Sequence, residues 1–480
     1  MSAPVAERNG PTAGSVRSRE ASLLVGAIAL PIAGLAILGW SVSPDLSPTV
    51  TATAVSLAVI ATVAHLAVRA AAPDADPVLL PLALLLNGFG LVLVRRVDLA
   101  AGSSLAAAQT GWTTLSVGAL ILTLLFVRRV GALGRLPYSM GLATILLLLA
   151  PLVPGLTAGV INGARLWIDL GGMRFQPGEL AKITMVLFLA GYLERNRSLL
   201  SVATQRVGPL LIPAPRHLAP VLLAAGAALA ILAGLRDLGS ALLFFMTFIA
   251  MLYVATGRVA YPVLGLGAFG AGATLVHRAF DHVQTRVAIW LDPWADVSGA
   301  GYQIAQSIFA LATGGLTGTG LGLGRPQDVP FVATDAILVV AGEELGLLGA
   351  TALLVAYLLL VVRGLRIAMT ARDEFGTLLA TGLAFTLAIQ TFVIVGGLTR
   401  IVPLTGITLP FVSYGGSSLL ANHIIIALLL RISDESRGAA RGRDMDAPSW
   451  FARRVALARD DGGGRERQPG PGDHDRGATR

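Results

Sequence analysis

The chain has 480 residues, of which 54% are hydrophobic and 13% are charged, whereas an average soluble domain has about a quarter of its residues charged. This balance excludes an ordinary soluble protein. The chain contains no cysteine, so disulfide bonds, thiol chemistry and cysteine-bound metals are excluded as well.

Apolar runs long enough to cross a membrane recur along most of the chain. A helix needs about 20 residues to cross a hydrocarbon core about 30 Å thick. The runs are continuously apolar and lack the alternation of a transmembrane β-strand, so they predict helices. We predict an all-α integral membrane protein, a polytopic bundle of about twelve transmembrane helices. The expected spans are 21–41, 50–68, 78–94, 112–127, 138–154, 177–193, 218–234, 238–256, 260–280, 336–362, 376–397 and 408–430.

The basic residues predict the orientation of the bundle. A net charge of +8 would suggest nucleic-acid binding in a soluble protein, but here the arginines cluster beside the spans and no nucleic-acid partner is expected. Clusters that begin at Arg128, Arg195 and Arg363 follow the fourth, sixth and tenth spans. With the basic residues near both ends of the chain, they place both termini in the cytoplasm. Arg95 and Arg96 fall on the opposite side and contradict this scheme.

The chain divides into four parts by composition. The long segment 281–335 is expected outside the cytoplasm, and a loop of this length is usually functional. Within the tail, Ser449–Asp460 fits either an amphipathic helix on the anionic inner leaflet or a solvated linker. The expected parts are a disordered cytoplasmic N-terminus (1–20), two additional N-terminal helices (21–77), a membrane core (78–432) and a disordered, charged cytoplasmic tail (433–480).

Ionisable groups inside or at the ends of spans are costly, so each is a candidate functional residue. The span 177–193 is preceded by Gln176 and opens with Glu179 and Lys182, which share one helix face because they are three residues apart. Lys182 is the only lysine among 36 lysines and arginines. Its ammonium group suits a phosphate or carboxylate ligand. The alternative is a salt bridge to Glu179 without any role in ligand binding.

Two further pairs lie on the expected outer side. Arg165 stands beside Trp167, and we predict that Arg165 binds an anion because the positive-inside rule disfavours an outer arginine. Trp167 fits an anchor at the membrane interface. Arg236 and Asp237 lie between two spans, where they either belong to the site or form a local ion pair that closes the turn.

The long outer loop and the last span add more polar residues. Asp335 ends the loop, and as a residue of a first helical turn it is expected to be kept ionised by the helix dipole. It could instead start the helix without any chemistry. Glu343 and Glu344 are expected to have structural partners. The remaining candidates are Tyr302 and Gln303 in the loop, and Ser413, Tyr414 and Ser417 in a stretch of small and hydroxyl-bearing residues that suits a polar cavity or close helix packing.

Six sequence blocks carry a resemblance to a known family. They are GARLWI, FQPGELAK, RDLGSA, GYQIAQSIFALATGGLTGTGLG, TDAILVVAGEELGLLG and LPFVSYGGSS. In this order they resemble the SEDS proteins, the RodA/FtsW/SpoVE family, over residues 78–432. The two preceding spans and the tail resemble the larger RodA-type members of actinobacteria. The chain departs from the family at Gly178, Ala336 and Ile394, where serine, phenylalanine and asparagine are usual.

The resemblance implies a peptidoglycan glycosyltransferase that polymerises lipid II outside the bacterial cytoplasmic membrane, among membrane lipids, together with a class B penicillin-binding protein that cross-links the glycan strands. It implies that Asp335 is the catalytic residue. A divalent cation such as Mg²⁺ or Mn²⁺ could take part, but the sequence offers no clear ligand cluster. The expected substrate-binding residues are Arg165, Lys182, Glu179, Arg236 and Asp237, and the expected cavity lining is Trp167, Gln176, Tyr302, Gln303, Ser413, Tyr414 and Ser417.

Two other classes of function fit the same sequence. A lipid flippase or secondary transporter also has many spans with buried charge, but it needs polar groups along a path to both faces. The polar groups of this chain gather on one side, which favours the enzyme. A non-catalytic scaffold is the third hypothesis, and it predicts that Asp335 and Lys182 are dispensable.

Overall fold

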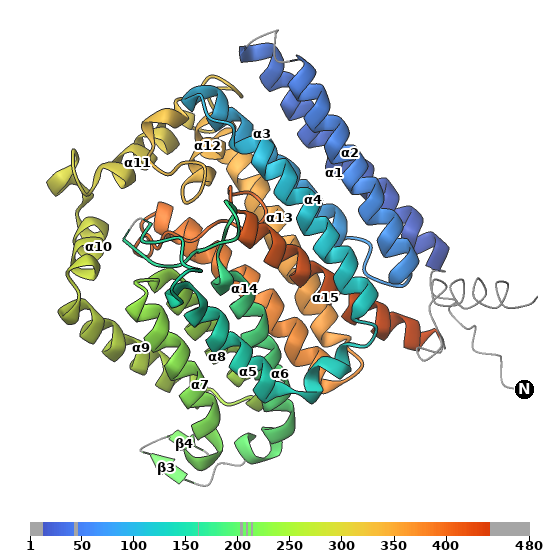
Figure 1. Ribbon diagram of the computed structural model, residues 1–480, viewed down its shortest axis with the longest axis vertical. Coiled ribbons are helices and arrows are strands. Elements are labelled where there is room, and N and C mark those ends of the chain that lie inside the picture. Colours follow the sequence, from blue (N-terminus) through green and yellow to red (C-terminus); the bar gives the residue numbers. More distant parts are fainter. Residues whose placement is uncertain are drawn as a thin grey trace, which may run out of the picture.

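Helices make up nearly all of the regular structure, as predicted (Figure 1). The computed structural model describes residues 13–42, 47–161, 163–201, 205–207, 210–212 and 215–441. The long helices are α1 (Ala13–Val42), α2 (Ser47–Ala71), α3 (Leu79–Ala101), α4 (Leu105–Phe126), α5 (Pro137–Leu149), α6 (Pro177–Ser201), α7 (Pro215–Gly234), α8 (Leu238–Thr256), α9 (Ala260–Ala279), α13 (Gly346–Met369), α14 (Glu374–Leu398) and α15 (Gly416–Ala440).

The expected count of about twelve spans is not confirmed, although every expected span overlaps a helix. In the described part of the chain, eight helices are long and apolar enough to cross a membrane, or nine if α9 and the helix after it form one bent span. Helix α6 is long enough but has charged residues near both ends. The apolar parts of α5 and α7 are shorter than a full span.

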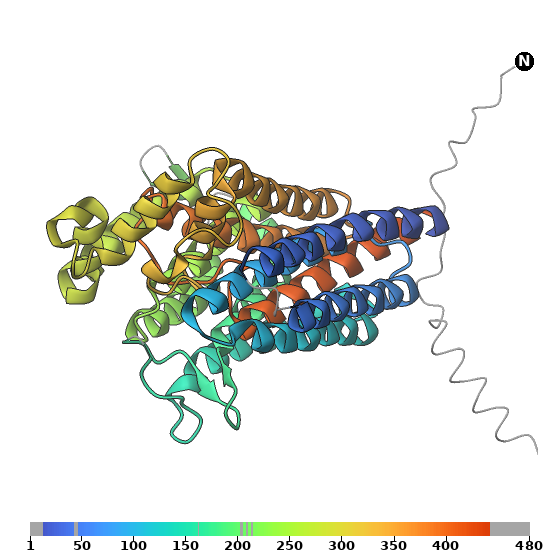
Figure 2. The same ribbon diagram turned by 90° about the horizontal axis from the view of Figure 1, so that it is seen from above.

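The connections expected in the cytoplasm meet at one end of the bundle. Arg195 near the end of α6 donates to the carbonyl of Gly134 in the α4–α5 connection over 3.0 Å. Arg197 forms an ion pair of 2.9 Å with Glu374 at the start of α14. The start of α1 and the end of α15 lie at this end too, opposite the segment between α9 and α13 (Figure 2). The chain therefore alternates between the two ends as the arginine pattern predicted.

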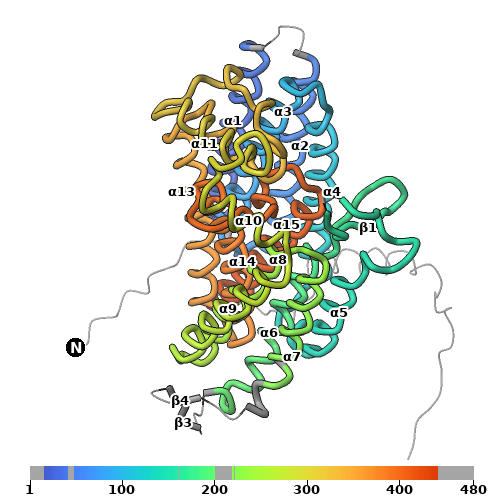
Figure 3. Tube along the Cα trace, turned by 90° about the vertical axis from the view of Figure 1, so that its left-hand side faces the viewer, coloured from blue at the N-terminus to red at the C-terminus, as the bar shows by residue number. Residues whose placement is uncertain are grey.

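Three helices form the centre of the bundle. In α15, 83% of the most apolar stretch is buried, and α3 and α14 are similarly enclosed, whereas only 22% is buried in α2. Helices α1 and α2 pack along one flank, against α3 and α4 (Figure 1). The hairpin of β1 (Ile168–Asp169) and β2 (Arg174–Phe175) projects beside α4 and α5 (Figure 3). A second hairpin joins β3 (Gln205–Val207) to β4 (Leu210–Ile212) between α6 and α7.

The segment 281–335 is built largely of helices rather than extended loop. It contains α10 (Asp281–Leu291), the 3₁₀ turn η4 (Pro293–Asp296), α11 (Tyr302–Gly314) and the 3₁₀ turn η5 (Pro326–Asp328), and α12 (Ile337–Glu344) follows. Shorter 3₁₀ turns, η2 (Val130–Arg135) and η3 (Ala150–Leu152), flank α5. Helix α10 leaves α9 at a bend of 110°, which carries it across the end of the bundle.

The contacts of Arg96 explain why this arginine departs from the positive-inside pattern. It is buried, and its Nε lies 2.6 Å from Oε1 of Glu344. The same guanidinium donates to the carbonyl of Gly324, and Glu343 accepts from the backbone N–H of Arg325 over 3.0 Å. The structural role expected for Glu343 and Glu344 is confirmed. Arg96 pairs with a buried carboxylate, so its position does not count against the predicted orientation.

Both ends of the described chain differ from the expected boundaries. Helix α1 begins at Ala13, within the segment expected to be disordered, and α15 continues to Ala440, beyond the expected end of the core. Residues 1–12 and 442–480, including the possible amphipathic helix Ser449–Asp460, lie outside the described residues.

Candidate functional site

Asp335 lies in a tight turn just before α12. Its backbone N–H donates to the carbonyl of Phe331 over 3.0 Å. Two residues that precede α15 hold this turn from the side: Tyr414 donates its N–H to the carbonyl of Ala333 over 2.8 Å, and the Ser413 hydroxyl donates to the carbonyl of Thr334. The hydroxyl-bearing stretch before the last helix thus fixes the backbone that carries Asp335.

The Asp335 carboxylate is partly buried against Gly406. A Cβ atom built on Gly406 would lie 3.5 Å from Oδ2 of Asp335, and the φ of +74° at this position also favours glycine. Burial raises the pKa of Asp335 to about 6, although a hydrogen bond from Thr334 and the charge of Arg286 act to lower it. Asp335 precedes Ala336, the N-cap residue of α12, so it does not lie in the first helical turn as expected, and desolvation brings its pKa closer to neutrality than that of an exposed aspartate.

Lys182 is buried and has two partners. Its Nζ lies 2.6 Å from Oε2 of Glu179 and donates to Oε1 of Gln390 over 2.8 Å. Gln390, in α14, donates from its Nε2 to the carbonyl of Thr408 over 2.7 Å. The salt-bridge interpretation of Lys182 is therefore confirmed, and with only 2% of its surface exposed the ammonium has little room for a ligand.

Asp237 caps α8 rather than pairing with its neighbour. Its Oδ1 accepts from the N–H of Ser240 over 2.9 Å, as an N-cap residue does. Arg236 is exposed, has a φ of +62°, and forms no ion pair with Asp237. The local ion pair proposed for this turn is therefore wrong. Burial raises the pKa of Asp237, and so does the charge of Glu179, whereas the charge of Arg286 lowers it.

Residues 405–408, here called the central segment, lie between Asp335, Gln390, Arg286 and the first turn of α8. Thr405 and Ile407 pack against Gly239 in the first turn of α8. Gly406 lies close enough to Asp335 that a Cβ atom built on it would be 3.5 Å from Oδ2, and the carbonyl of Thr408 accepts from Gln390. The carbonyl of Thr405 also accepts a hydrogen bond of 3.3 Å from Nη1 of Arg286 in α10. Four parts of the sequence thus converge on one short segment.

Arg286 and Gln390 were not predicted as site residues from the sequence. Arg286 lies on the expected outer side, so the argument that singled out Arg165 applied to it equally. Gln390 is a polar side chain inside an otherwise apolar span, which is itself a signal. Neither belongs to a charged pair in the sequence, and their importance follows only from the contacts that the fold creates.

The remaining candidates divide into two groups. Gln176 donates its N–H to the Ser417 hydroxyl over 2.8 Å, and Gln303 donates from its Nε2 to the carbonyl of Pro330 over 3.2 Å, so both brace the site. Arg165, Trp167 and Tyr302 are not brought to the central segment by any described contact. Arg165 and Tyr302 are exposed, and Trp167 is partly buried in the loop just before β1.

A metal site is not evident in the described part of the chain. No group of three or more histidine, aspartate or glutamate side chains is arranged to hold a metal ion there. The carboxylates of Glu179 and Asp237 already serve a salt bridge and a helix cap. The described side chains therefore do not fit a dedicated divalent-cation site made of protein ligands alone.

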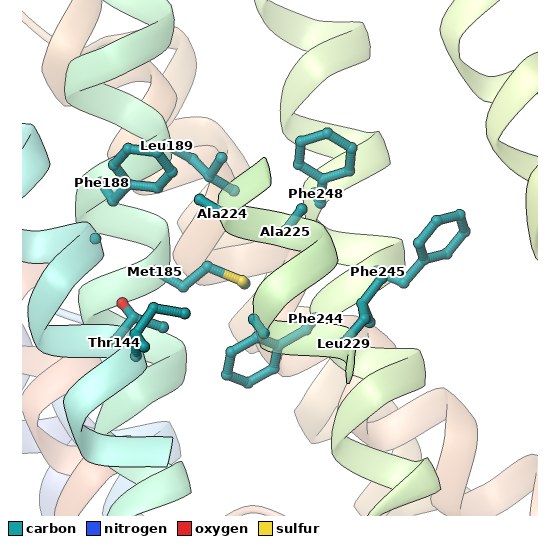
Figure 4. Close-up of a pocket in the computed structure, with 13 residues that line it drawn as sticks. Thr144, Met185, Phe188, Leu189, Ala224, Ala225, Leu229, Phe244, Phe245 and Phe248 are labelled. Carbon is teal, nitrogen blue, oxygen red and sulfur yellow. The ribbon is translucent and has the colours of Figure 1, made fainter. Parts of the chain in front are cut away.

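An apolar cleft lies between α5, α6, α7 and α8. Phe188, Phe244 and Phe248 border it, together with Met185 and alanines of α7 (Figure 4). The cleft is partly open to the surroundings and is not a closed cavity. The hydroxyl of its polar member, Thr144, bonds to Thr184 over 2.8 Å. The cleft contains no ionisable side chain, so the chemistry belongs to the polar groups around the central segment.

Residues 77–438 match the family model of FtsW, RodA and SpoVE, described as "Cell cycle protein". The chain belongs to the FtsW/RodA/SpoVE family. The match begins after α2, so both α1 and α2 precede the part that this protein shares with the family. The resemblance stated from the six sequence blocks is confirmed.

Named relatives of this FtsW/RodA/SpoVE protein are glycosyltransferases. It is 45% identical over 386 residues to "Peptidoglycan glycosyltransferase RodA" of Mycobacterium tuberculosis, covering 79% of this chain and 82% of that protein. It is 39% identical to "Probable peptidoglycan glycosyltransferase FtsW" of Geobacter sp., covering 62% of this chain and 79% of that protein. A chain solved in a peptidoglycan synthase complex that coordinates polymerization and crosslinking is 28% identical, with a TM-score of 0.61, covering 75% of this chain and 98% of that one.

Proposed function

We propose that this protein, a peptidoglycan glycosyltransferase, polymerises lipid II into glycan strands with Asp335 as the general base. The observation that carries the proposal is the Asp335 carboxylate, which is partly buried in the polar cluster at one end of the bundle. A base works best when its pKa lies near the operating pH, and a pKa of about 6 leaves the carboxylate ionised yet more basic than an exposed aspartate.

The proposed reaction is an inverting displacement. The 4-hydroxyl oxygen of the acceptor GlcNAc attacks C1 of the donor MurNAc, and its proton passes to a carboxylate oxygen of Asp335. The bond from C1 to the diphosphate oxygen breaks, and its electron pair leaves with undecaprenyl diphosphate. General base catalysis of this kind contributes about 10²–10⁴-fold to the rate.

The contacts of Lys182 favour a positioning role. Its ammonium holds Glu179 and, through Gln390, the central segment, so it joins α6 to the backbone beside Asp335. Lys182 was expected to bind substrate directly. Its burial argues against direct contact with a diphosphate. Arg165 could still reach substrate from the exposed outer loop, since the described residues provide it with no ion pair.

The arrangement of the two ends of the bundle supports our proposal for the location of the enzyme. Both described ends of the chain lie at the end of the bundle where basic connections meet, and the polar cluster lies at the other. Under the positive-inside rule, the site faces the outside of the cytoplasmic membrane and both termini face the cytoplasm. The related synthase complex supports a partner that cross-links strands, which we propose is a class B penicillin-binding protein.

Incubation of the purified, full-length protein with labelled lipid II, with and without the candidate partner, tests this function. Glycan polymer is expected from the unmutated protein and not from Asp335→Asn. If Asp335→Asn protein of normal folding still polymerises lipid II, the assignment of the base is wrong. Movement of labelled lipid across vesicle membranes without polymer would indicate a flippase instead.

A further inference from the structure

We infer that Arg286 binds the diphosphate of the donor substrate beside Asp335. This inference rests on the proposed function, since it names the group that holds the leaving end of the same substrate. It concerns a residue of α10, a short helix that lies across the end of the bundle and not within the central helices (Figure 1).

The geometry places Arg286 at the junction of the two acidic groups. Its Nη1 donates to the carbonyl of Thr405 over 3.3 Å. A Cβ atom built on the next residue, Gly406, would lie 3.5 Å from Oδ2 of Asp335, and Thr405 itself packs against Gly239, two residues after Asp237. The guanidinium therefore reaches the central segment where Asp335 approaches from one side and the start of α8 from the other.

Arg286 still has hydrogen-bond donors to offer. A guanidinium has five N–H donors, and the described contacts of Arg286 use one of them, at a long distance. It forms no ion pair within 4.0 Å among the described residues, and its side chain is only partly buried. The charge of Arg286 lowers the pKa of both Asp335 and Asp237, but neither carboxylate forms an ion pair with it.

The other basic side chains around the site are less suited to this role. Lys182 is buried and bonded to Glu179 and Gln390. The Arg400 guanidinium is committed to the carbonyls of Trp290 and Leu291, at 3.0 and 2.8 Å from its Nη2. Arg286 thus combines nearness to Asp335 with donors that remain available.

The position of Arg286 favours the donor over the acceptor. The base must lie within hydrogen-bond reach of the attacking hydroxyl, about 2.6–3.2 Å, and that hydroxyl must approach C1 of the donor to about 3–3.5 Å. The diphosphate is bonded to this same C1, so a cation next to Asp335 lies near the leaving group. A planar guanidinium binds phosphate oxygens with two parallel hydrogen bonds, and it stabilises the charge that develops as the bond breaks.

Steady-state polymerisation of lipid II by Arg286→Ala, Arg286→Gln and Arg286→Lys tests the inference. Removing a preorganised donor to developing charge costs about 10²–10³-fold in rate. We expect a loss of this size in Arg286→Ala and Arg286→Gln, with partial recovery in Arg286→Lys. Arg278→Ala is the matched control, because Arg278 is exposed at the end of the neighbouring α9 and has no described contact with the site. It should stay within about twofold of the unmutated protein, well short of the loss expected at Arg286.

A binding measurement separates this inference from the proposed function. Undecaprenyl diphosphate is titrated into nanodiscs that contain either Asp335→Asn or the double variant Asp335→Asn/Arg286→Gln. We expect at least tenfold weaker binding in the double variant, since charged hydrogen bonds of this kind contribute about 1.5–3 kcal/mol. Equal affinities would overturn the role of Arg286 even if Asp335→Asn is inactive. An active Asp335→Asn protein would instead overturn the proposed base.

Discussion

Lys182 and Gln390 form a hydrogen bond of 2.8 Å between α6 and α14, although 208 residues separate them in the chain. Gln390 links Lys182 to the central segment, because its amide nitrogen donates to the carbonyl of Thr408. On its other side the ammonium neutralises Glu179. A single buried lysine thus determines how the first turns of α6 meet the central segment, and this makes its loss a test of positioning.

Lys182→Met is expected to destabilise the protein strongly. The substitution keeps the length of the side chain but leaves the partly buried Glu179 and the buried Gln390 without their partner. Breaking a buried ion pair on one side costs about 3–5 kcal/mol. Thermal unfolding of the purified protein in detergent measures the loss.

The double variant Lys182→Met/Glu179→Gln supplies the control for this prediction. Because it removes both charges, it should recover a large part of the stability lost in Lys182→Met alone. Equal stability of the single and double variants would show that the ion pair does not account for the effect.

The pH dependence of polymerisation is expected to follow Asp335. Burial raises its pKa to about 6, and only the ionised carboxylate can accept the proton of the attacking hydroxyl. Activity should therefore fall as the pH drops through about 6, one to two units above the range of an exposed aspartate. A profile of kcat/KM against pH that stays flat down to pH 5 would exclude Asp335 as the base.

Asp335→Asn is expected to stabilise the fold at neutral pH. The pKa of Asp335 is higher in the folded protein than its ordinary value of 3.8, so deprotonation opposes folding and stability is lost as the pH rises from about 4 to about 6. Two units correspond to at most about 3 kcal/mol. The variant should unfold at a higher temperature than the unmutated protein at pH 7.5, and the difference should shrink near pH 4. A lower unfolding temperature at pH 7.5 would contradict this account.

The sequence predicted the helices well because continuous apolar runs have few other ways to satisfy their backbone groups in a membrane. It also predicted the ends at which the charged connections gather. Segment 281–335 was harder to predict, since its helices are short and amphipathic. Asp335 was identified from its place at the start of a span, but its raised pKa follows from burial, which only the folded chain creates.

Several pairings could not be predicted from local sequence. Arg96 counted against the predicted orientation until its partner was seen to be Glu344, 248 residues away. Arg236 and Asp237 suggested an ion pair because they are adjacent, yet the backbone turns one side chain outward and uses the other as a cap. Such outcomes depend on which residues the fold brings together, and hydropathy and charge patterns do not contain that information.

Arg96→Met is expected to loosen the glycine-rich segment 314–325. Glu344 accepts from the N–H groups of Gly322 and Gly324, and Arg96 donates to the carbonyl of Gly324. Without the guanidinium, the carboxylate stays buried and unpaired, at a cost of about 3–5 kcal/mol. Limited proteolysis should cut this segment faster in Arg96→Met than in Arg95→Met, the neighbouring control. Equal rates would show that the ion pair does not hold the segment.

Arg400→Ala is expected to weaken catalysis, although we expect no contact between Arg400 and the substrate. Arg400 holds the end of α10, because it donates to the carbonyls of Trp290 and Leu291 while its own carbonyl accepts from the Trp290 indole over 3.0 Å. Its loss should let α10 shift and carry Arg286 away from Thr405. A residue that acts only by positioning Arg286 should lower kcat/KM about tenfold, mainly through kcat, and the effect should largely vanish when Arg286 is already glutamine. Fully additive losses in the double variant would show that Arg400 acts independently of Arg286.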